Sequence, residues 1–318
     1  MKKAAKWLFL AAFKVPLGRG ERIRTFDPLV PNQMRYQAAL RPDSRYSNRR
    51  ALRALRWVNL FPHTIGCMSQ TSPALPWLMP GDPFPDVALA WGDASDAPGL
   101  LAAGGVLSVE TLQRAYRHGI FPWFSPGQPT LWWSPDPRMV LQSEHFQLHR
   151  SLRKTLQRFA RTPHCEVRMD SAFAQVITAC AQSPRGGNHG TWIVPAMVDA
   201  YTQLHAAGIA HSVETWVNGE LVGGLYCVAI GRAVFGESMF ARRPDTSKIA
   251  LAALVAFCRK HAITIIDCQQ NTAHLASLGA SEMPRTRFVA HVDQAAELPA
   301  PNWHFSPLYW DLIFRLPE

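Results

Sequence analysis

The sequence predicts an α+β, or mixed α/β, fold, and features of the second half of the chain indicate it. Three strands joined by short turns occupy residues 211–240, a helix follows to about residue 261, and an apolar strand occupies 263–269. A strand meander connected by a helix to a further strand is typical of domains in which helices pack against one sheet. With 318 residues, the chain can bury one large core or two small ones.

The strands are recognised by alternation and by their turns. His211–Val217 alternates and runs into Asn218-Gly219, a strong hairpin signal because both central residues of such a turn need a positive φ. The returning strand is Glu220–Ile230, and Gly231-Arg232 connects it to Ala233–Phe240. We therefore expect three neighbouring antiparallel strands.

The helices are recognised by their caps and apolar stripes. Ser108 is a good N-cap for a helix over Val109–His118, and Gly119 ends that helix. The same signals predict further helices over 150–160, from the cap Ser171 to Cys180, from Pro195 to Ala207, and from the cap Thr246 or Ser247 to about His261.

Positive charge is confined to the first part of the chain. Residues 1–67 contain 14 Lys and Arg against 3 Asp and Glu, a net +11, whereas residues 68–318 contain 19 against 20, a net −1. The basic composition is therefore no evidence that the body binds nucleic acid. We expect residues 1–67 to be disordered or a non-native extension before a functional start near Met68, with a basic RNA-binding tail as the alternative.

Composition divides the rest of the chain into three parts. Residues 68–146 are rich in Pro, Gly and Trp and predict a small aromatic-rich domain. Residues 147–300 contain the meander and most of the predicted helices, so they predict the larger domain. Residues 301–318 form a C-terminal tail.

Several classes of protein are not indicated. No apolar run approaches the roughly 20 residues of a membrane span. Six cysteines without a C-x-x-C pair favour reduced thiols and a cytoplasmic location. A metal site is not expected, because His145 and His149 lack the surrounding H-E-x-x-H pattern.

Polar residues on two short apolar runs are the candidates for a site. Asp267 and Gln269 lie two residues apart in one strand, so both side chains should point to the same face, and Glu237 lies in the preceding strand. Burying unpaired polar groups is costly. These residues therefore serve catalysis or ligand binding, or they form a satisfied structural network.

At these residues the chain resembles the leucyl/phenylalanyl-tRNA–protein transferases, bacterial enzymes of N-terminal protein tagging, in family order over roughly residues 81–290. The segments that carry the resemblance are Gly99–Gly105, Ala115–Trp123, Leu131–Arg138, Thr191–Ile193, Ala200-Tyr201, His211–Glu214, Leu221–Tyr226, Gly236–Phe240, Ser247-Lys248, Asp267–Gln269 and His274–Ala280.

The resemblance implies a specific reaction. Such enzymes move Leu or Phe, with Met as a further candidate, from aminoacyl-tRNA to the α-amino group of proteins that begin with Arg or Lys. The product is then recognised for degradation. It also implies that residues 147–300 fold like the acyl-CoA N-acyltransferases, and that no metal or organic cofactor is used.

The resemblance also implies roles for individual residues. Gln269 contacts the attacking amine, Asp267 is its polarising partner, and Glu237 lies nearby. An amide is a poor base, so Gln269 is expected to orient the amine rather than deprotonate it. The amino-acid pocket and the tRNA 3′ end are assigned by family position, with plain core packing as the alternative, to Leu225, Val234, Leu254, Ile266, Trp133 and Trp192.

A basic helix face is the candidate contact with tRNA phosphates. Its members, on the helix predicted over 150–160, are Arg150, Arg153, Lys154 and Arg158. A solvated helix face is the alternative reading.

Two rival functions stay open. An acyl-CoA-dependent acetyltransferase would need a [QR]-x-x-G-x-[GA] loop for the pyrophosphate, which Gln182–Gly187 does not provide. A non-catalytic tRNA-binding protein would not need Asp267 or Gln269.

Deleting residues 1–67 should leave aminoacyl transfer unchanged, because the composition changes at Met68 and the resemblance lies beyond it. Initial transfer rates of the full and shortened chains at equal concentration test this. A large loss in the shortened chain would refute it.

Overall fold

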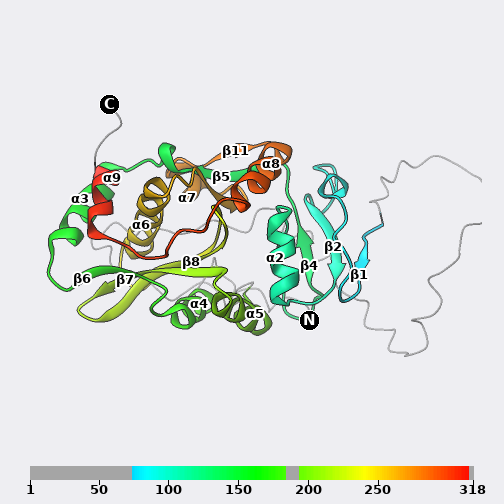
Figure 1. The fold of residues 1–318 in the computed structure, drawn as a ribbon, viewed down its shortest axis with the longest axis horizontal. Coiled ribbons are helices and arrows are strands. Elements are labelled where there is room, and N and C mark those ends of the chain that lie inside the picture. Colours follow the sequence, from blue (N-terminus) through cyan, green and yellow to red (C-terminus); the bar gives the residue numbers. More distant parts are fainter. Residues whose placement is uncertain (1–73, 184–192, 315–318) are drawn as a thin grey trace, which may run out of the picture.

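The computed structural model describes residues 74–183 and 193–314, which contain a small and a large β-sheet with helices packed against them (Figure 1). The predicted α+β class is confirmed. The two sheets are built from different parts of the chain, and the candidate site residues lie on the large one.

The small sheet lies in the N-terminal part of the described chain. In spatial order its strands are β1 (Trp77–Leu78), β2 (Leu100–Gly104), β4 (Leu131–Trp133) and β3 (Phe121–Pro122). The 3-10 helix η2 (Val87–Leu89) precedes β2, and α2 (Val109–Arg117) connects β2 to β3. As predicted, Ser108 caps α2, because its side chain accepts a hydrogen bond from the backbone N–H of Thr111.

The large sheet contains the predicted meander. In spatial order its strands are β11 (Ser281–Met283), β5 (Arg138–Gln142), β10 (Ile265–Gln269), β9 (Ala233–Ala241), β8 (Glu220–Ile230), β7 (Ala210–Val217) and β6 (Cys165–Met169). β7, β8 and β9 are antiparallel neighbours, whereas β9 and β10 are parallel. Because β5 is the antiparallel partner of β10, the large sheet begins before the boundary predicted between residues 146 and 147.

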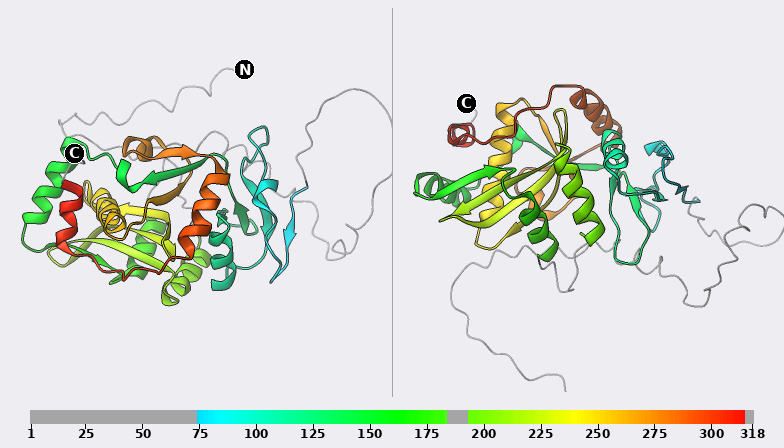
Figure 2. Two further views of the ribbon diagram at one scale, coloured as in Figure 1. Left: turned by 45° about the horizontal axis from the view of Figure 1, so that its top comes forward. Right: turned by 60° about the horizontal axis from the view of Figure 1, so that its bottom comes forward.

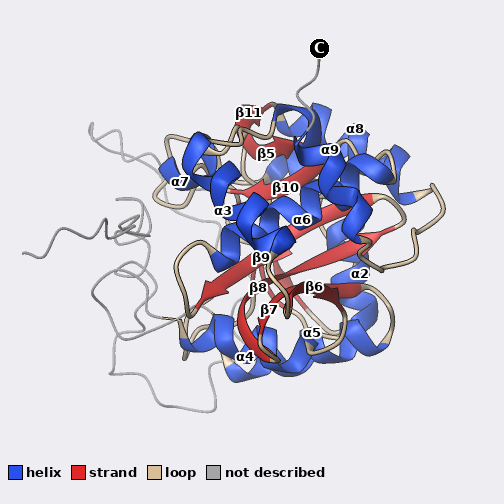
Figure 3. Cartoon of the chain, turned by 90° about the vertical axis from the view of Figure 1, so that its left-hand side faces the viewer, coloured by secondary structure: helices blue, strands red, loops and turns tan. Residues whose placement is uncertain are grey.

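Helices cover both faces of the large sheet (Figure 3). α4 (Phe173–Gln182) and α5 (Pro195–Ala206) lie on one face, and α6 (Thr246–Lys260) lies on the other. The remaining helical elements are η3 (Ser143–His145), α3 (Arg150–Arg161), α7 (Ala273–Ser277), α8 (Arg285–Ala296), η4 (Pro307–Trp310) and α9 (Asp311–Phe314). Figure 2 shows the chain after α8 returning along the molecule to α9, next to α3.

Two predicted helix caps are wrong, because the N-cap positions are Ala172 for α4 and Asp245 for α6, and neither helix has a side-chain cap. Ser171 donates its hydroxyl to the carboxylate of Glu214 on β7. Thr246 and Ser247 lie inside α6, and the hydroxyl of Thr246 donates to the carbonyl oxygens of Val222 on β8 at 2.9 Å and of Arg243 at 2.8 Å.

The buried side chains form one hydrophobic cluster on each face of the large sheet. The cluster on the α4 and α5 face also contains residues of the small sheet, such as Leu101 and Trp132, so the two sheets share a core. The cluster on the α6 face includes Phe305, Trp310 and Ile313. Part of the predicted C-terminal tail is therefore packed into the core.

α6 lies so close to the sheet that Gly223 of β8 has no room for a side chain. An added Cβ would meet Oγ1 of Thr246 at 2.4 Å and its Cβ at 2.5 Å. We predict that Gly223→Ala lowers the free energy of unfolding by about 1–3 kcal/mol, the usual cost of overpacking. Gly92→Ala is the control, because nothing lies within 4 Å of its added methyl group. Chemical denaturation measures both, and equal stability of the two variants would contradict the prediction.

Candidate active site

Two β-bulges lie side by side where the candidate residues are found. The parallel pairing of β9 with β10 extends to Phe235 and Asp267. Beyond it, Glu237 is an extra residue in β9 relative to β8, and Cys268 is an extra residue in β10 relative to β5. A bulge bends its strand and redirects the neighbouring side chains. The bulges therefore explain how polar side chains from two strands converge at this point.

Asp267 forms a fully buried ion pair with Arg138 of β5. Nε and Nη2 of Arg138 donate to the two carboxylate oxygens at 2.8 and 2.7 Å, and both side chains are 0% exposed. Nη1 donates to the carbonyl oxygen of Gly119 at 3.1 Å, and the guanidinium lies 4.8 and 4.6 Å from the ring centroids of Phe121 and Phe288. The pair thus connects β5, β10, α8 and the segment between α2 and β4.

Gln269 ends β10 in a left-handed backbone conformation, with φ of 59°. Its backbone N–H donates to Oδ1 of Asp267 at 2.9 Å, and its side-chain Nε2 donates to Oε1 of Glu237 at 3.4 Å. Asp267 therefore contacts the backbone of Gln269, whereas Glu237 contacts its side-chain amide. Neither of these contacts involves the amide oxygen of Gln269. The predicted polarisation of the amide by Asp267 is not seen as a direct contact.

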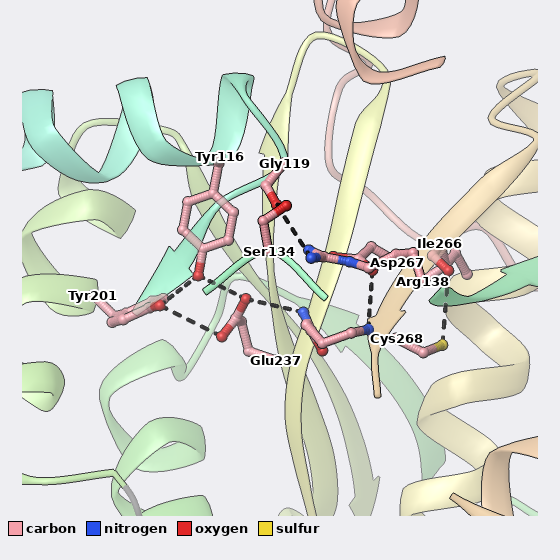
Figure 4. A network of polar contacts seen from close by, with 10 residues as sticks. Tyr116, Gly119, Ser134, Arg138, Tyr201, Glu237, Ile266, Asp267 and Cys268 are labelled. Atoms are coloured by element: carbon pink, nitrogen blue, oxygen red, sulfur yellow. Dashed lines mark hydrogen bonds and ion pairs between the residues drawn. The ribbon is translucent and has the colours of Figure 1, made fainter. Parts of the chain in front are cut away.

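Glu237 is the centre of a second set of contacts (Figure 4). Its Oε1 accepts a hydrogen bond from the hydroxyl of Tyr116 at 2.7 Å, and its Oε2 accepts one from Tyr201 at 3.4 Å. The two tyrosine hydroxyls are also hydrogen-bonded to each other. Both tyrosines are fully buried, whereas Glu237 is partly exposed. Side chains from α2, α5, β9 and β10 therefore meet at one carboxyl group.

Burial changes the acidity of this group. It raises the pKa of Glu237 to about 8, although the hydrogen bond from Tyr116 acts in the opposite direction. The charge of Asp267 raises the same pKa further, and the charge of Arg138 lowers it. Burial also raises the pKa of both tyrosines well above the usual value. A carboxyl group that titrates near neutral pH beside an oriented amide can accept a proton from a nucleophile.

Three residues of this site were not among the candidates identified from sequence. They are Tyr116, Arg138 and Tyr201. All three lie in segments that carry the family resemblance, so that resemblance was the available signal. Nothing in local sequence indicates that they contact Asp267 and Glu237, because they come from α2, β5 and α5 and meet only in the folded chain.

The four aliphatic residues assigned to an amino-acid pocket do lie together. Leu225, Val234, Leu254 and Ile266 belong to the same buried cluster, between the large sheet and α6. This is the opposite face of the sheet from the cluster that contains Tyr116 and Tyr201.

Of the two tryptophans assigned to the tRNA 3′ end, the structure describes Trp133 alone. Trp133 is 3% exposed, and its indole N–H donates to the carbonyl oxygen of Trp123. It therefore offers little ring surface for stacking. Trp123, tilted against it with 5.3 Å between ring centroids, is partly exposed. Trp192 lies outside the described residues.

The predicted basic face is present on α3. Arg150, Lys154 and Arg158 are exposed, whereas Arg153 is half-buried and donates Nη1 to the carbonyl oxygen of Phe314 at 2.8 Å. Arg153 therefore also has a structural role. Figure 1 shows α3 at the end of the molecule opposite the small sheet.

Among the residues that the structure describes, no three His, Cys, Asp or Glu side chains are grouped in a way that could hold a metal ion. None of the described helices is long and apolar enough to cross a membrane.

Comparison with known proteins identifies the family. The profile described as leucyl/phenylalanyl-tRNA protein transferase matches residues 140–293, and the profile of its N-terminal domain matches residues 105–136. Two curated proteins named leucyl/phenylalanyl-tRNA–protein transferase are among the relatives. The one from Polaromonas sp. JS666 is 64% identical over 75% of this chain and 94% of its own length. The one from Albidiferax ferrireducens is 62% identical over 79% of this chain and 98% of its own length.

These matches place the chain among the transferases. It belongs to the leucyl/phenylalanyl-tRNA protein transferase family. The resemblance read from the sequence is confirmed.

The buried ion pair should be essential for stability. Asp267→Asn leaves the Arg138 cation without a counter-charge, so we predict a loss of about 3–5 kcal/mol in the free energy of unfolding. Replacing both residues, Arg138→Met with Asp267→Leu, should recover part of this loss because no unpaired charge stays buried. Glu297→Gln is the control, since its ion pair with Arg117 is exposed and should contribute about 0–1 kcal/mol. An Asp267→Asn protein as stable as the control would show that the pair does not hold the site together.

Proposed function

We propose that this protein transfers Leu or Phe from aminoacyl-tRNA to the α-amino group of proteins that begin with Arg or Lys, and so marks them for degradation. Membership of the transferase family supports transfer from aminoacyl-tRNA. The particular donors and acceptors are those that the resemblance implies.

The observation that carries the proposal is the orientation of the Gln269 amide. Nε2 of Gln269 donates to Glu237, which leaves the neighbouring amide oxygen of Gln269 as a hydrogen-bond acceptor. The N–H of a neutral amine is a suitable donor for that oxygen. In this arrangement Gln269 positions the α-amine, and Asp267 fixes the backbone on which Gln269 sits.

Positioning is sufficient for much of the rate. The aminoacyl ester is already activated, so the enzyme has to hold the amine against the ester carbonyl and stabilise the charge of the tetrahedral intermediate. The rigid support of Gln269 by the Arg138–Asp267 pair is consistent with this requirement. The exposed cations of α3 would hold tRNA phosphates at a distance from the reacting atoms.

The ion pair also bears on the choice of acceptor. Both oxygens of Asp267 are bound by Arg138, so its charge is neutralised and it is a poor partner for the cationic first residue of an acceptor protein. We therefore assign recognition of an N-terminal Arg or Lys to groups other than Asp267.

The first test is transfer of radiolabelled leucine from Leu-tRNA to a model protein that begins with Arg, compared with the same protein beginning with Ala. We expect label on the Arg protein alone. Repeating the assay with labelled phenylalanine, isoleucine and valine defines the donor, and the β-branched pair should be poor. Binding of tRNA without label on either protein would favour the non-catalytic alternative.

A further inference from the structure

Three oxygen-bearing side chains from three elements, Tyr116, Tyr201 and Glu237, form a closed triangle (Figure 4). Tyr116 bonds to Oε1 of Glu237, Tyr201 bonds to Oε2, and the two hydroxyls bond to each other. The tyrosines are fully buried, so no solvent competes for these bonds, whereas Glu237 is partly exposed. Nε2 of Gln269 also donates to Oε1 of Glu237 at 3.4 Å, so the triangle adjoins the amide to which we assign the orientation of the amine.

The triangle is satisfied in either protonation state of Glu237. In the ionised state Tyr116 donates to Oε1, and Tyr201 donates to Oε2 or to the Tyr116 oxygen. In the protonated state the hydroxyl on Oε2 donates to Tyr201, Tyr201 donates to Tyr116, and Tyr116 donates to Oε1. Hydroxyl hydrogens rotate freely, so neither state leaves a buried polar group unpaired at the cost that such groups carry.

We propose that Glu237 takes the proton from the attacking α-amine and returns it to the leaving ribose oxygen, and that Tyr116 and Tyr201 are positioning residues that keep it ready in both states. This proposal rests on the function proposed above and deepens it. Gln269 then orients the amine, and Glu237 handles its proton.

The atoms balance in two steps. The amine nitrogen forms a bond with the ester carbonyl carbon, the carbonyl electron pair moves to oxygen, and one N–H proton passes to the Glu237 carboxylate. The tetrahedral intermediate then collapses: the carbonyl re-forms and the bond to the ribose oxygen breaks. The hydrogen on Oε2 of Glu237 turns from Tyr201 to the ribose oxygen and is transferred to it. The enzyme ends in its starting state.

The acidity of Glu237 suits this role. Its pKa of about 8 lies close to neutral pH, so both protonation states of the carboxyl are accessible, and the group can accept a proton and later return it. The charged and titratable groups that act on its pKa are Tyr116 of α2, Tyr201 of α5, Asp267 of β10 and Arg138 of β5. The charge of Glu237 in turn raises the pKa of the Cys227 thiol of β8.

The test is the pH dependence of kcat/KM for Tyr116→Phe. The hydrogen bond from Tyr116 lowers the pKa of Glu237, so its loss should move the acid limb of the profile to higher pH. The rate should fall near pH 7 and recover toward the wild-type value at high pH. The acceptor amine titrates identically with both enzymes, so a shift between them belongs to the enzyme. Tyr201→Phe should act in the same direction.

Two further variants complete the experiment. Glu237→Gln should lower kcat by about 10²–10⁴-fold, the usual contribution of a general base. The acid limb of its kcat/KM profile should then reflect the titration of the acceptor amine alone. Tyr309→Phe is the matched control. The ring of Tyr309 packs on Phe305 in the segment that leads to α9, outside the contacts of Glu237. The pH profile of kcat/KM for this variant should therefore equal that of the wild type.

The titration of Glu237 is also read directly, by ¹³C NMR of its side-chain carboxyl in the free enzyme. If the wild-type enzyme transfers leucine but the acid limb of the kcat/KM profile is unshifted in both tyrosine variants, the proposed role of Glu237 is wrong and the proposed function stands. A Glu237 carboxyl that titrates near 4 would overturn the proposed role as well. A wild-type protein without transfer activity would instead overturn the proposed function.

Discussion

The buried ion pair between Arg138 and Asp267 is the interaction on which the rest of the site depends. It is made by neighbouring strands of the large sheet, yet Arg138 also bonds to Gly119 and lies between Phe121 and Phe288. One guanidinium therefore fixes the small sheet, α8 and the end of β10 relative to one another. Charges taken out of water need such complete pairing, because an unmatched partner would be strongly destabilising.

The second constraint is the interruption of regular strand pairing at Glu237 and Cys268. A regular ladder would place side chains at fixed alternating positions. The bulges interrupt this alternation in β9 and β10 where the pairing of the two strands ends. Gln269, the last residue of β10, has a left-handed backbone conformation. Asp267 stabilises this conformation through the backbone N–H of Gln269. Strain at the strand end is thus offset by the same carboxylate that Arg138 holds.

Local patterns predicted the elements well because their causes are local. The Asn218-Gly219 turn, the Ser108 cap and the strand over His211–Val217 are each predicted from a few neighbouring residues, and each is present in the structure. The caps proposed for α4 and α6 are wrong: the N-cap positions are Ala172 and Asp245, and the hydroxyl groups of Ser171 and Thr246 contact β7 and β8. A hydroxyl group bonds to whatever acceptor the fold brings closest, and local sequence does not contain that information.

The sequence alone determined the α+β class, the meander, the family and the choice of Asp267, Gln269 and Glu237 as the polar residues of interest, since these follow from local pattern and from resemblance. Only the tertiary structure decided which groups each of these residues contacts. In the folded chain Asp267 pairs with Arg138, and the side-chain amide of Gln269 donates to Glu237. Two buried tyrosine hydroxyls bond to the same Glu237 carboxyl group. The reason is physical: hydrogen bonds and pKa values depend on which groups meet in space and how far from water they lie, and these partners are contributed by α2, β5 and α5, far apart in the chain.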